Sequence, residues 1–446
     1  MKIEGEEKMS TENKRDGFTS RLGFTLAAVG SAVGMSNVWA FPYRTATYGG
    51  GAYLLPYIIC VIVLGSTGIV EEISFGRWAK TGPLGAMQKA IDKPGIKHIG
   101  IIPVLSSFAM AAGYAVIMGW GIRYLVGAFT GQVTGDVDPG AYFGAITGEF
   151  GSIPWHVAAL ILAIIAGVAG VARGIEKINK VVMPLFYILF IGMAIYMLTI
   201  PGSSEGYKYL FIPRAEMLLN PKTWVYALGQ AFFSLSLAGN GSVIYGSYLS
   251  RKEDAVLAAR NVAIFDTLAA VLASLVIIPA VFAFHKDLGA GPALMFITLP
   301  AIFREMGAFG QIFAIIFFLA IFFAAISSLM NLFEAPIEML QDKLHMKRPV
   351  AVALVVGLGF LLGVFLESGD VIGNWMDLIS IYFCPVGALL AGICFYWVLD
   401  RKTAEAEMSL GRDKPLPKWM YPVGKYVYCG IAIAVIVLGI ALGGIG

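Results

Sequence analysis

Two segments of this 446-residue chain combine glycine, hydroxyl and amide side chains within otherwise apolar stretches. The first, GSAVGMSNVWAFP, runs from Gly30 to Pro42, and the second, FSLSLAGNGS, runs from Phe233 to Ser242. If the helix is interrupted there, backbone N–H groups at a helix start can attract a carboxylate, and the freed carbonyls can attract cations. The alternative is helix packing, because Gly30 and Gly34 form a GxxxG pattern that lets two helices approach closely.

The composition places these segments in a membrane protein. Hydrophobic residues make up 58% of the chain, the mean hydropathy is +0.77, and only 14% of the residues are charged. A soluble domain carries about 25% charged residues, so this chain could not cover its apolar surface in water. The net charge of +3, without a dense basic stripe, argues against nucleic acid as a partner. We therefore predict a polytopic protein whose surroundings are the lipid bilayer.

The sequence carries no pattern typical of catalysis or of a soft-metal site. Cys60, Cys384, Cys394 and Cys429 stand in apolar runs without CxxC spacing, which is typical of packing residues. An HExxH motif is absent, as are paired catalytic carboxylates beside a nucleophile. We expect neither an enzyme nor an organic cofactor.

Stretches poor in charge and long enough to cross a bilayer recur along the chain. The eleven candidates are residues 22–43, 45–70, 99–122, 153–172, 181–204, 223–250, 267–284, 308–333, 350–366, 371–399 and 421–445. Lys and Arg gather in alternate connections, which predicts a cytoplasmic N-terminus and an external C-terminus. The expected organisation is a cytoplasmic tail (1–21), five helices (22–200), an external loop (201–222), five helices (223–399), a cytoplasmic loop (400–420) and helix eleven (421–446).

The two polar segments occupy the first and sixth of these spans, at corresponding positions of two five-span halves. Unwound backbone at the bilayer midplane is tolerated only where a ligand, an ion or a neighbour pairs it. Interruptions at matching places in two halves therefore point to the binding site of a secondary transporter.

Several runs resemble the neurotransmitter:sodium symporter family, in order, over roughly residues 15 to 400. They are RLGFTLAAVGSAVGMSNVWAFPY, GGGAYLLPY, GYAVIMGW, GQAFFSLSLAGNGSVIYGSY and FFAAISSLMNLFEAP. The resemblance implies an all-α polytopic fold of the LeuT type, a 5+5 inverted repeat with broken helices 1 and 6 and eleven transmembrane helices. Gly174 and Pro184 resemble a family motif linked to helix unwinding and inward sodium release. The short termini and loops are similar to bacterial members, so we expect a bacterial cytoplasmic membrane.

The resemblance implies two Na+ ions. Sodium site one would be formed by the Ala32 carbonyl with Asn37, Ser234 and Asp266. Sodium site two would be formed by the carbonyls of Gly30, Val33 and Ala324 with the hydroxyls of Ser327 and Ser328. Neutral and anionic oxygens suit a hard cation. For the two serines alone, hydrogen bonding between helices is the competing interpretation.

The resemblance also implies an amino-acid site. Its predicted residues are Ala32, Gly34, Met35, Ser36, Met110, Tyr114, Phe233, Ser234, Ser236, Gly239, Ser328 and Leu332. Family members for biogenic amines have an Asp where this chain has Gly34, so the substrate is expected to bring its own carboxylate. The absent side chain at Gly239 favours larger hydrophobic or aromatic amino acids. Alternatively, Asn240 supports the unwound backbone and Gly239 only lets it turn.

Charged residues at both ends resemble the gates of the family. The family's outer gate pairs an Arg with an Asp; Asp377 matches the Asp, but Ala40 occupies the position of the Arg. Arg44, one turn further on, is a candidate replacement, although a solvated Arg44 and a separately satisfied Asp377 are the alternative. The inner gate would comprise Arg15 and Asp342, supported by Tyr248 and Glu334, and Glu72 would satisfy unwound backbone.

Asp266 stands where chloride-dependent relatives have Asn, and Ala270 stands where they have a chloride-binding Ser. A fixed carboxylate can supply the charge that chloride supplies elsewhere, so we predict chloride-independent, sodium-coupled import of amino acids by alternating access. The sequence leaves open whether protons are transported in the opposite direction. The alternative function is a sodium-dependent amino-acid sensor, or a non-transporting binding protein, on the same fold.

Overall fold

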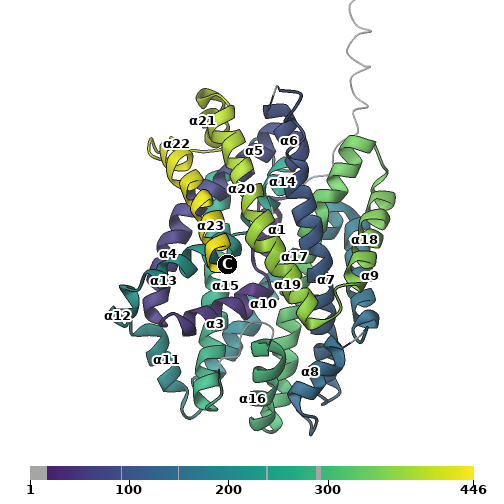
Figure 1. The fold of residues 1–446 in the computed structure, drawn as a ribbon, viewed down its shortest axis with the longest axis vertical. Helices are drawn as coiled ribbons and strands as arrows, with labels where there is room; N and C mark the ends of the chain where they lie inside the picture. Colours follow the sequence, from purple (N-terminus) through teal and green to yellow (C-terminus); the bar gives the residue numbers. More distant parts are fainter. Residues whose placement is uncertain (1–17, 92, 149, 238–239, 288–292, 446) are drawn as a thin grey trace, which may run out of the picture.

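The chain folds into a bundle of helices that run between two opposite ends of the molecule (Figure 1). The structure, a computed structural model, describes residues 18–91, 93–148, 150–237, 240–287 and 293–445. Within these ranges every regular element is helical and none is a strand, so the prediction of an all-helical protein is confirmed.

The elements fall on either side of the connection near residue 200, with η marking a π-helical turn. Before it lie α1 (Arg21–Ala32), α2 (Met35–Val38), α3 (Ala40–Thr47), α4 (Gly51–Leu64), η2 (Gly65–Ile69), α5 (Val70–Ala79), α6 (Pro83–Ala90), α7 (Ile101–Phe129), α8 (Pro139–Thr147), α9 (Ile153–Gly170), η3 (Val171–Glu176) and α10 (Lys177–Met197). After it lie α11 (Ser203–Phe211), α12 (Ala215–Leu218), α13 (Pro221–Ser234), α14 (Gly241–Ser247), α15 (Ala255–Ala283), η5 (Leu294–Thr298), α16 (Leu299–Glu305), α17 (Ala308–Leu344), α18 (Arg348–Val364), α19 (Gly369–Leu378), η6 (Ile379–Phe383), α20 (Cys384–Ile393), η7 (Cys394–Val398), α21 (Arg401–Ser409), α22 (Met420–Pro422), η8 (Val423–Tyr428) and α23 (Cys429–Leu442).

Among the described residues, eight helices are long and apolar enough to cross a membrane, or nine if the bent pair α1 and α2–α3 is one span. Two further predicted spans do not meet that length. One is α18, an apolar helix of 17 residues. The other is divided into α13 and α14, with residues 238–239 between them outside the described part.

Several helices extend well beyond the charge-free runs that predicted them. The run 45–70 corresponds to a helix over Gly51–Ala79, and the run 267–284 to one over Ala255–Ala283. The extensions carry charged residues that are buried in the bundle, among them Glu72 and Asp266. A charge-free run therefore indicates the part of a helix that faces lipid better than it indicates where the helix begins and ends.

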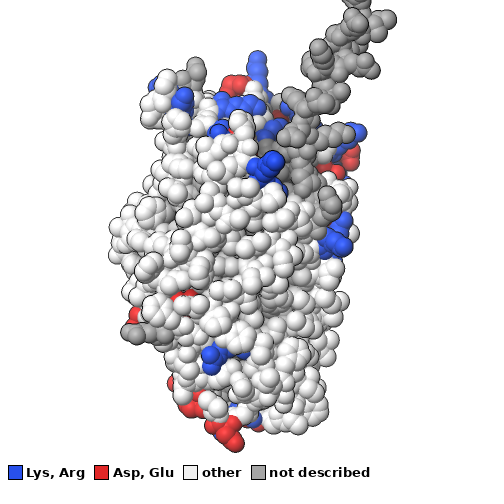
Figure 2. All heavy atoms as spheres, turned by 90° about the vertical axis from the view of Figure 1, so that its right-hand side faces the viewer, with Lys and Arg blue, Asp and Glu red and all other residues white. Residues whose placement is uncertain are grey.

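A face of the molecule carries its charges mainly near the two ends, with a largely uncharged band between them (Figure 2). The end that includes α6 and α21 is opposite the end that includes α8, α11 and α16 (Figure 1). Large apolar side chains are exposed along the helices between these ends, for example Ile188 on α10 and Leu361 on α18. An exposed apolar band of this kind is expected where lipid chains replace water.

Glycines hold α14 directly against the backbone of α5. A Cβ atom at Gly76 would lie 1.9 Å from the carbonyl oxygen of Val243, and one at Gly246 would lie 2.3 Å from that of Ile73. Small residues permit this close approach of two helices. The short helix α14 is thereby fixed to α5, which carries Glu72.

A buried ion pair attaches α5 to α21, a helix in the region predicted as the loop 400–420. Arg77 is fully buried, and its Nε lies 2.6 Å from Oε1 of Glu407, while its Nη1 donates to the carbonyl of Glu253 at 2.6 Å. The Asp400 side chain caps α21 at the Thr403 N–H, and hydrogen bonds from Thr403 lower the pKa of the Asp400 carboxyl. The region is therefore ordered by contacts that composition does not reveal.

Removing the carboxylate from this pair should destabilise the protein strongly. In Glu407→Ala the Arg77 guanidinium is left buried without its counter-charge, a loss of about 3–5 kcal/mol for pairs of this kind. We expect a lower midpoint of thermal unfolding in detergent, followed by tryptophan fluorescence. The control is Glu405→Ala on the same helix, because Glu405 pairs with the exposed Arg401. Equal midpoints for the two variants would contradict the prediction.

Candidate functional site

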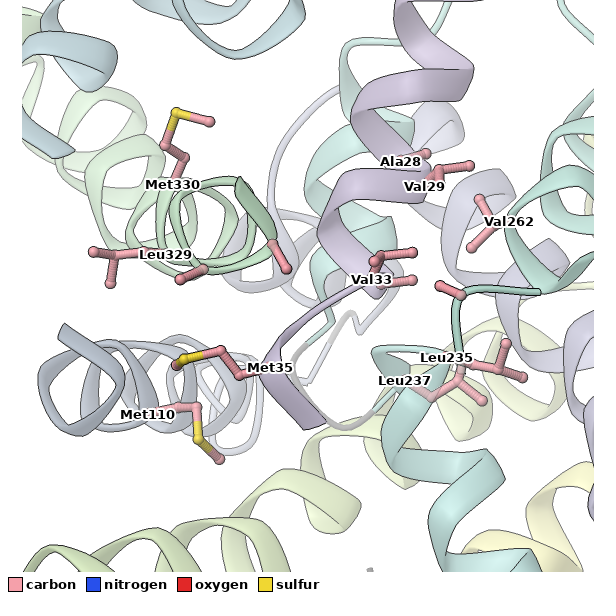
Figure 3. Close-up of a cluster of buried hydrophobic side chains, with 14 of the residues drawn as sticks. Ala28, Val29, Val33, Met35, Met110, Leu235, Leu237, Val262, Leu329 and Met330 are labelled. Atoms are coloured by element: carbon pink, nitrogen blue, oxygen red, sulfur yellow. The ribbon is translucent and has the colours of Figure 1, made fainter. Parts of the chain in front are cut away.

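The first polar segment interrupts a helix in the middle of the bundle. α1 ends at Ala32, Val33 and Gly34 are extended, and α2 begins at Met35, so that the two helical parts meet at 63°. The freed amide of Gly34 donates to Oδ1 of Asn37 at 2.9 Å, and that of Met35 donates to the Tyr114 hydroxyl at 3.1 Å. Figure 3 shows the chain leaving α1 at Val33, with Met35 across from Met110 of α7.

The second polar segment separates α13 from α14. Ser236 has φ 56° and Asn240 has φ 49°, left-handed values that stop a helix. The Asn240 side chain donates to Oε1 of Glu72 at 3.1 Å, and the Ser236 hydroxyl donates to the carbonyl of Ser31 at 2.9 Å. The two interrupted segments are therefore joined directly. Gly239, predicted to line the substrate pocket, lies outside the described residues.

The side chains predicted for sodium site one form one buried network. Nδ2 of Asn37 donates to Oδ1 of Asp266 at 2.7 Å, and the Ser234 hydroxyl donates to Oδ2 of Asp266 at 2.7 Å. All three side chains are at most 1% exposed. A carboxylate held by an amide and a hydroxyl, deep in the bundle, offers the oxygen atoms that a hard cation prefers.

The residues predicted for sodium site two lie where α17 faces the end of α1. The Ser328 hydroxyl donates to the carbonyl of Val33 at 3.2 Å and to that of Gly30 at 3.5 Å. The Ser327 hydroxyl instead donates within its own helix, to the carbonyl of Ala324 at 3.0 Å. Among the described residues, no group of three or more His, Cys, Asp or Glu could hold a metal ion.

A cavity of about 280 Å³ adjoins both interrupted segments. It is lined by ten of the residues predicted for the substrate: Ala32, Gly34, Met35, Ser36, Met110, Tyr114, Phe233, Ser236, Ser328 and Leu332. Ser234 is not among its lining residues, because its hydroxyl is bonded to Asp266. The lining is mainly apolar, and its polar side chains include some from the interrupted segments and from α7, α17 and α19.

Asn331 also lines the cavity, and the sequence analysis missed it. Its Oδ1 is buried and has no hydrogen-bond partner in the described part of the chain, and its Nδ2 would lie 2.5 Å from a Cβ atom at Gly241. It follows Ser328 by three residues on α17, so helical spacing alone places it on the same face.

The cavity extends to the residues predicted for the outer gate. Arg44 and Asp377 both line it, but no ion pair among the described residues joins them. Nη1 of Arg44 instead donates to Oε1 of Gln230 at 2.7 Å. The predicted pair therefore faces one space, and Arg44 has a partner on α13 that the sequence did not indicate.

At the other end, the inner-gate residues are divided between separate contacts. Arg15 lies outside the described residues. Asp342 accepts a hydrogen bond from Thr81 at 3.2 Å and lies 2.9 Å from the Lys343 ammonium. The Tyr248 hydroxyl donates to Glu334 at 2.8 Å, and Glu334 in turn forms an ion pair with Arg348. The partner of Glu334 on α18 was not predicted.

Comparison with known proteins identifies the class. The model of the Sodium:neurotransmitter symporter family matches residues 15–136 and 144–441. This chain belongs to that family, which is a family of transporters. The resemblance inferred from the sequence motifs is thereby confirmed.

Relatives include bacterial, archaeal and animal proteins. The sodium-dependent transporter YhdH of Bacillus subtilis is 32% identical over 90% of this chain and 92% of its own length. The sodium-dependent transporter MJ1319 of Methanocaldococcus jannaschii is 30% identical over 92% and 88%. The sodium-dependent neutral amino acid transporter B(0)AT2 of Pongo abelii is 31% identical over 61% of this chain and 41% of its own. The crystal structure of MhsT in complex with L-phenylalanine superposes with a TM-score of 0.86 at 33% identity, covering 95% of this chain and 99% of MhsT.

The arrangement of Arg44 and Asp377 gives a test of the outer gate. We expect Arg44→Asp or Asp377→Arg alone to reduce transport about ten-fold, the equivalent of about 1.4 kcal/mol. The double reversal should recover most of the loss, since it restores opposite charges across the cavity. The measurement is uptake by proteoliposomes.

A second variant, Gln230→Leu, removes the hydrogen bond between Arg44 and Gln230 and leaves both charges of the predicted outer gate in place. If Arg44 acts only through Gln230, this variant reproduces the loss and the double reversal recovers nothing, which would contradict the gate.

Proposed function

We propose that this protein is a sodium-coupled symporter that imports amino acids by alternating access and is not an enzyme. The observation that carries the proposal is a cavity at two interrupted helices that also form two buried clusters of oxygen atoms. The membership of the family and the amino-acid transporters among its relatives support it. Two Na+ ions are the proposed coupling cargo.

The substrate class follows from the polar groups of the cavity. The carboxylate of the amino acid would meet the amides of Met35 and Ser36 and the Tyr114 hydroxyl. Its ammonium would face the carbonyl oxygens of Ala32 and Phe233. Gly34 adds no carboxylate of its own, and a Cβ there would lie 3.2 Å from the Tyr114 hydroxyl and 3.1 Å from that of Ser328.

A hydrophobic or aromatic L-amino acid fits the rest of this space best. Met110, Ile117, Phe233 and Leu332 give the cavity apolar walls. MhsT, the structural relative, was crystallised with L-phenylalanine, which supports the same class here. The left-handed backbone of Asn240 and its bond to Glu72 favour a supporting role for that residue.

Coupling would arise from shared groups. Asn37 contributes to sodium site one and also holds the Gly34 amide beside the substrate cavity. Ser328 faces the cavity and the carbonyls of sodium site two. Each ion would order groups that the substrate uses, so each ligand strengthens the binding of the other.

We propose that the protein crosses the cytoplasmic membrane of a bacterium eleven times, with the N-terminus inside. The nine long apolar spans, counting the bent pair as one, together with α18 and α13–α14 make eleven. The two halves, residues 22–200 and 223–399, would form the 5+5 inverted repeat of the LeuT type. Lys and Arg in the connections at the α6 and α21 end support its cytoplasmic position.

The function is tested by a panel of labelled amino acids offered to proteoliposomes that contain the purified protein. We expect accumulation of one group, the hydrophobic or aromatic amino acids, with an inward sodium gradient and none with potassium, because both oxygen clusters need the cation. Protein-free liposomes are the control. Binding with sodium but no accumulation would favour the sensor, and no effect of sodium on any amino acid would refute the proposal.

Chloride should be dispensable, because Asp266 supplies a fixed negative charge beside sodium site one. Replacing chloride by gluconate should leave uptake unchanged. Asp266→Asn should reduce sodium-dependent uptake about ten-fold or more, since the loss of one charge–ion contact costs well over 1.4 kcal/mol. Ser274→Ala on the same helix is the control, because its hydroxyl contacts only the carbonyl of Ala270. Uptake abolished by gluconate would contradict the prediction.

A further inference from the structure

Asn179, in the first turn of α10, carries a buried polar atom without a partner. The residue is 0% exposed, and its Nδ2 donates to the carbonyl of Ile175 at 2.9 Å. Its Oδ1 is buried and accepts no hydrogen bond from the described residues. A buried acceptor left unpaired costs about 1–3 kcal/mol, so an atom of this kind in a folded protein calls for an explanation.

The orientation of this amide is fixed by its other end. The carbonyl of Ile175 can only accept, so the NH₂ group must face it and the oxygen must face away. The oxygen then points at α1. A Cβ atom at Gly30 would lie 2.0 Å from Oδ1 of Asn179 and 3.2 Å from Cβ of Ser327. Oδ1 is therefore beside two residues predicted for sodium site two.

A second side-chain oxygen that packs against a glycine of α1, on η3, does have hydrogen-bond donors. Two turns earlier, a Cβ atom at Gly23 would lie 2.0 Å from Oε1 of Glu176. That carboxylate accepts hydrogen bonds from the Thr19 amide and hydroxyl and from Ser20, and it pairs with Lys180. Asn179 has no such set of donors.

Gly30 and Ser327, the residues beside Oδ1 of Asn179, donate no hydrogen bond to it. The carbonyls of Gly30 and Val33 accept from Ser328, and the Ser327 hydroxyl donates within its own helix. An acceptor oxygen that lacks a donor, in a region that also contains carbonyl and hydroxyl oxygens, is an environment that a hard cation stabilises.

We propose that Asn179 is a further residue of sodium site two, and that its amide oxygen binds the ion of that site directly or through one water. The inference rests on the proposed sodium coupling and adds α10 to the elements that hold the ion. Sodium site two would then connect α1, α17 and α10. The ion would fix the first turn of α10 at Asn179, which lies five residues after Gly174.

The test measures sodium binding to the purified full-length protein without amino acid, by isothermal titration and by the sodium-induced rise in the unfolding midpoint. Asn179→Ala and Asn179→Leu should each raise the sodium concentration for half-saturation about ten-fold, as for residues that support a metal site. Asn179→Asp keeps an oxygen and should bind sodium more tightly than Asn179→Leu. Ser274→Ala is the matched control, since it removes another buried polar group that contacts only its own helix.

Asn179→Leu also separates sodium binding from packing. Leucine is similar in size to asparagine but lacks the unpaired oxygen. The unfolding midpoint of this variant in potassium should therefore be no lower than that of the parent. The stabilisation by sodium should shrink. A midpoint lowered equally in sodium and potassium would overturn the inference and leave a purely structural role.

Combination with other variants identifies which ion is affected. The effects of Asn179→Ala and Ser328→Ala should be less than additive, because both residues serve one ion, whereas Asn179→Ala and Asp266→Asn should be additive. Unchanged sodium binding in Asn179→Ala overturns this inference alone. Absence of sodium binding by the parent protein overturns the proposed function itself.

Discussion

The constraint on which the rest of this structure depends is backbone that leaves the helical state inside an apolar bundle. Each freed N–H or C=O must find a partner, because neither water nor lipid is at hand to supply one. The partners include Tyr114 on α7, Ser328 on α17 and Asn37 within the interrupted segment itself, while Glu72 on α5 accepts from the side chain of Asn240. The polar residues of the core therefore stabilise the interrupted backbone in the first place, and a ligand that binds there takes over some of these hydrogen bonds.

The frame that permits these interruptions is built from close contacts between backbones. Glycines at 76 and 246 let α14 lie on α5, and those at 23 and 30 let α1 receive side-chain oxygens from η3 and α10. The long helices α7 and α17 pack together beside the cavity, and both supply side chains to it. Short helices that could not stand alone are thus held by neighbours that span the whole bundle.

The sequence predicts the membrane class, the helical fold and the positions of the two polar segments, because composition and glycine–amide clusters are local properties. Ten of the twelve residues predicted for the substrate, through motifs shared with a family, line the cavity. It does not predict the contact of Arg44 with Gln230 or the pair of Arg77 with Glu407, since each joins residues that are far apart in the chain. Asn179 was missed for the same reason: a single amide in a helix gains meaning only when its oxygen is found opposite Gly30.

The Ser328 hydroxyl has a consequence for the carbonyl oxygens that face it. Its proton lies between the oxygen of Ser328 and the carbonyls of Val33 and Gly30, at the long distances of 3.2 and 3.5 Å. Rotation about one side-chain bond would turn a lone pair where that proton was, so a cation could replace it without a change of backbone. A proton that is already covalently held thus screens these oxygens from one another, so their mutual repulsion is reduced without a charge taken from solution.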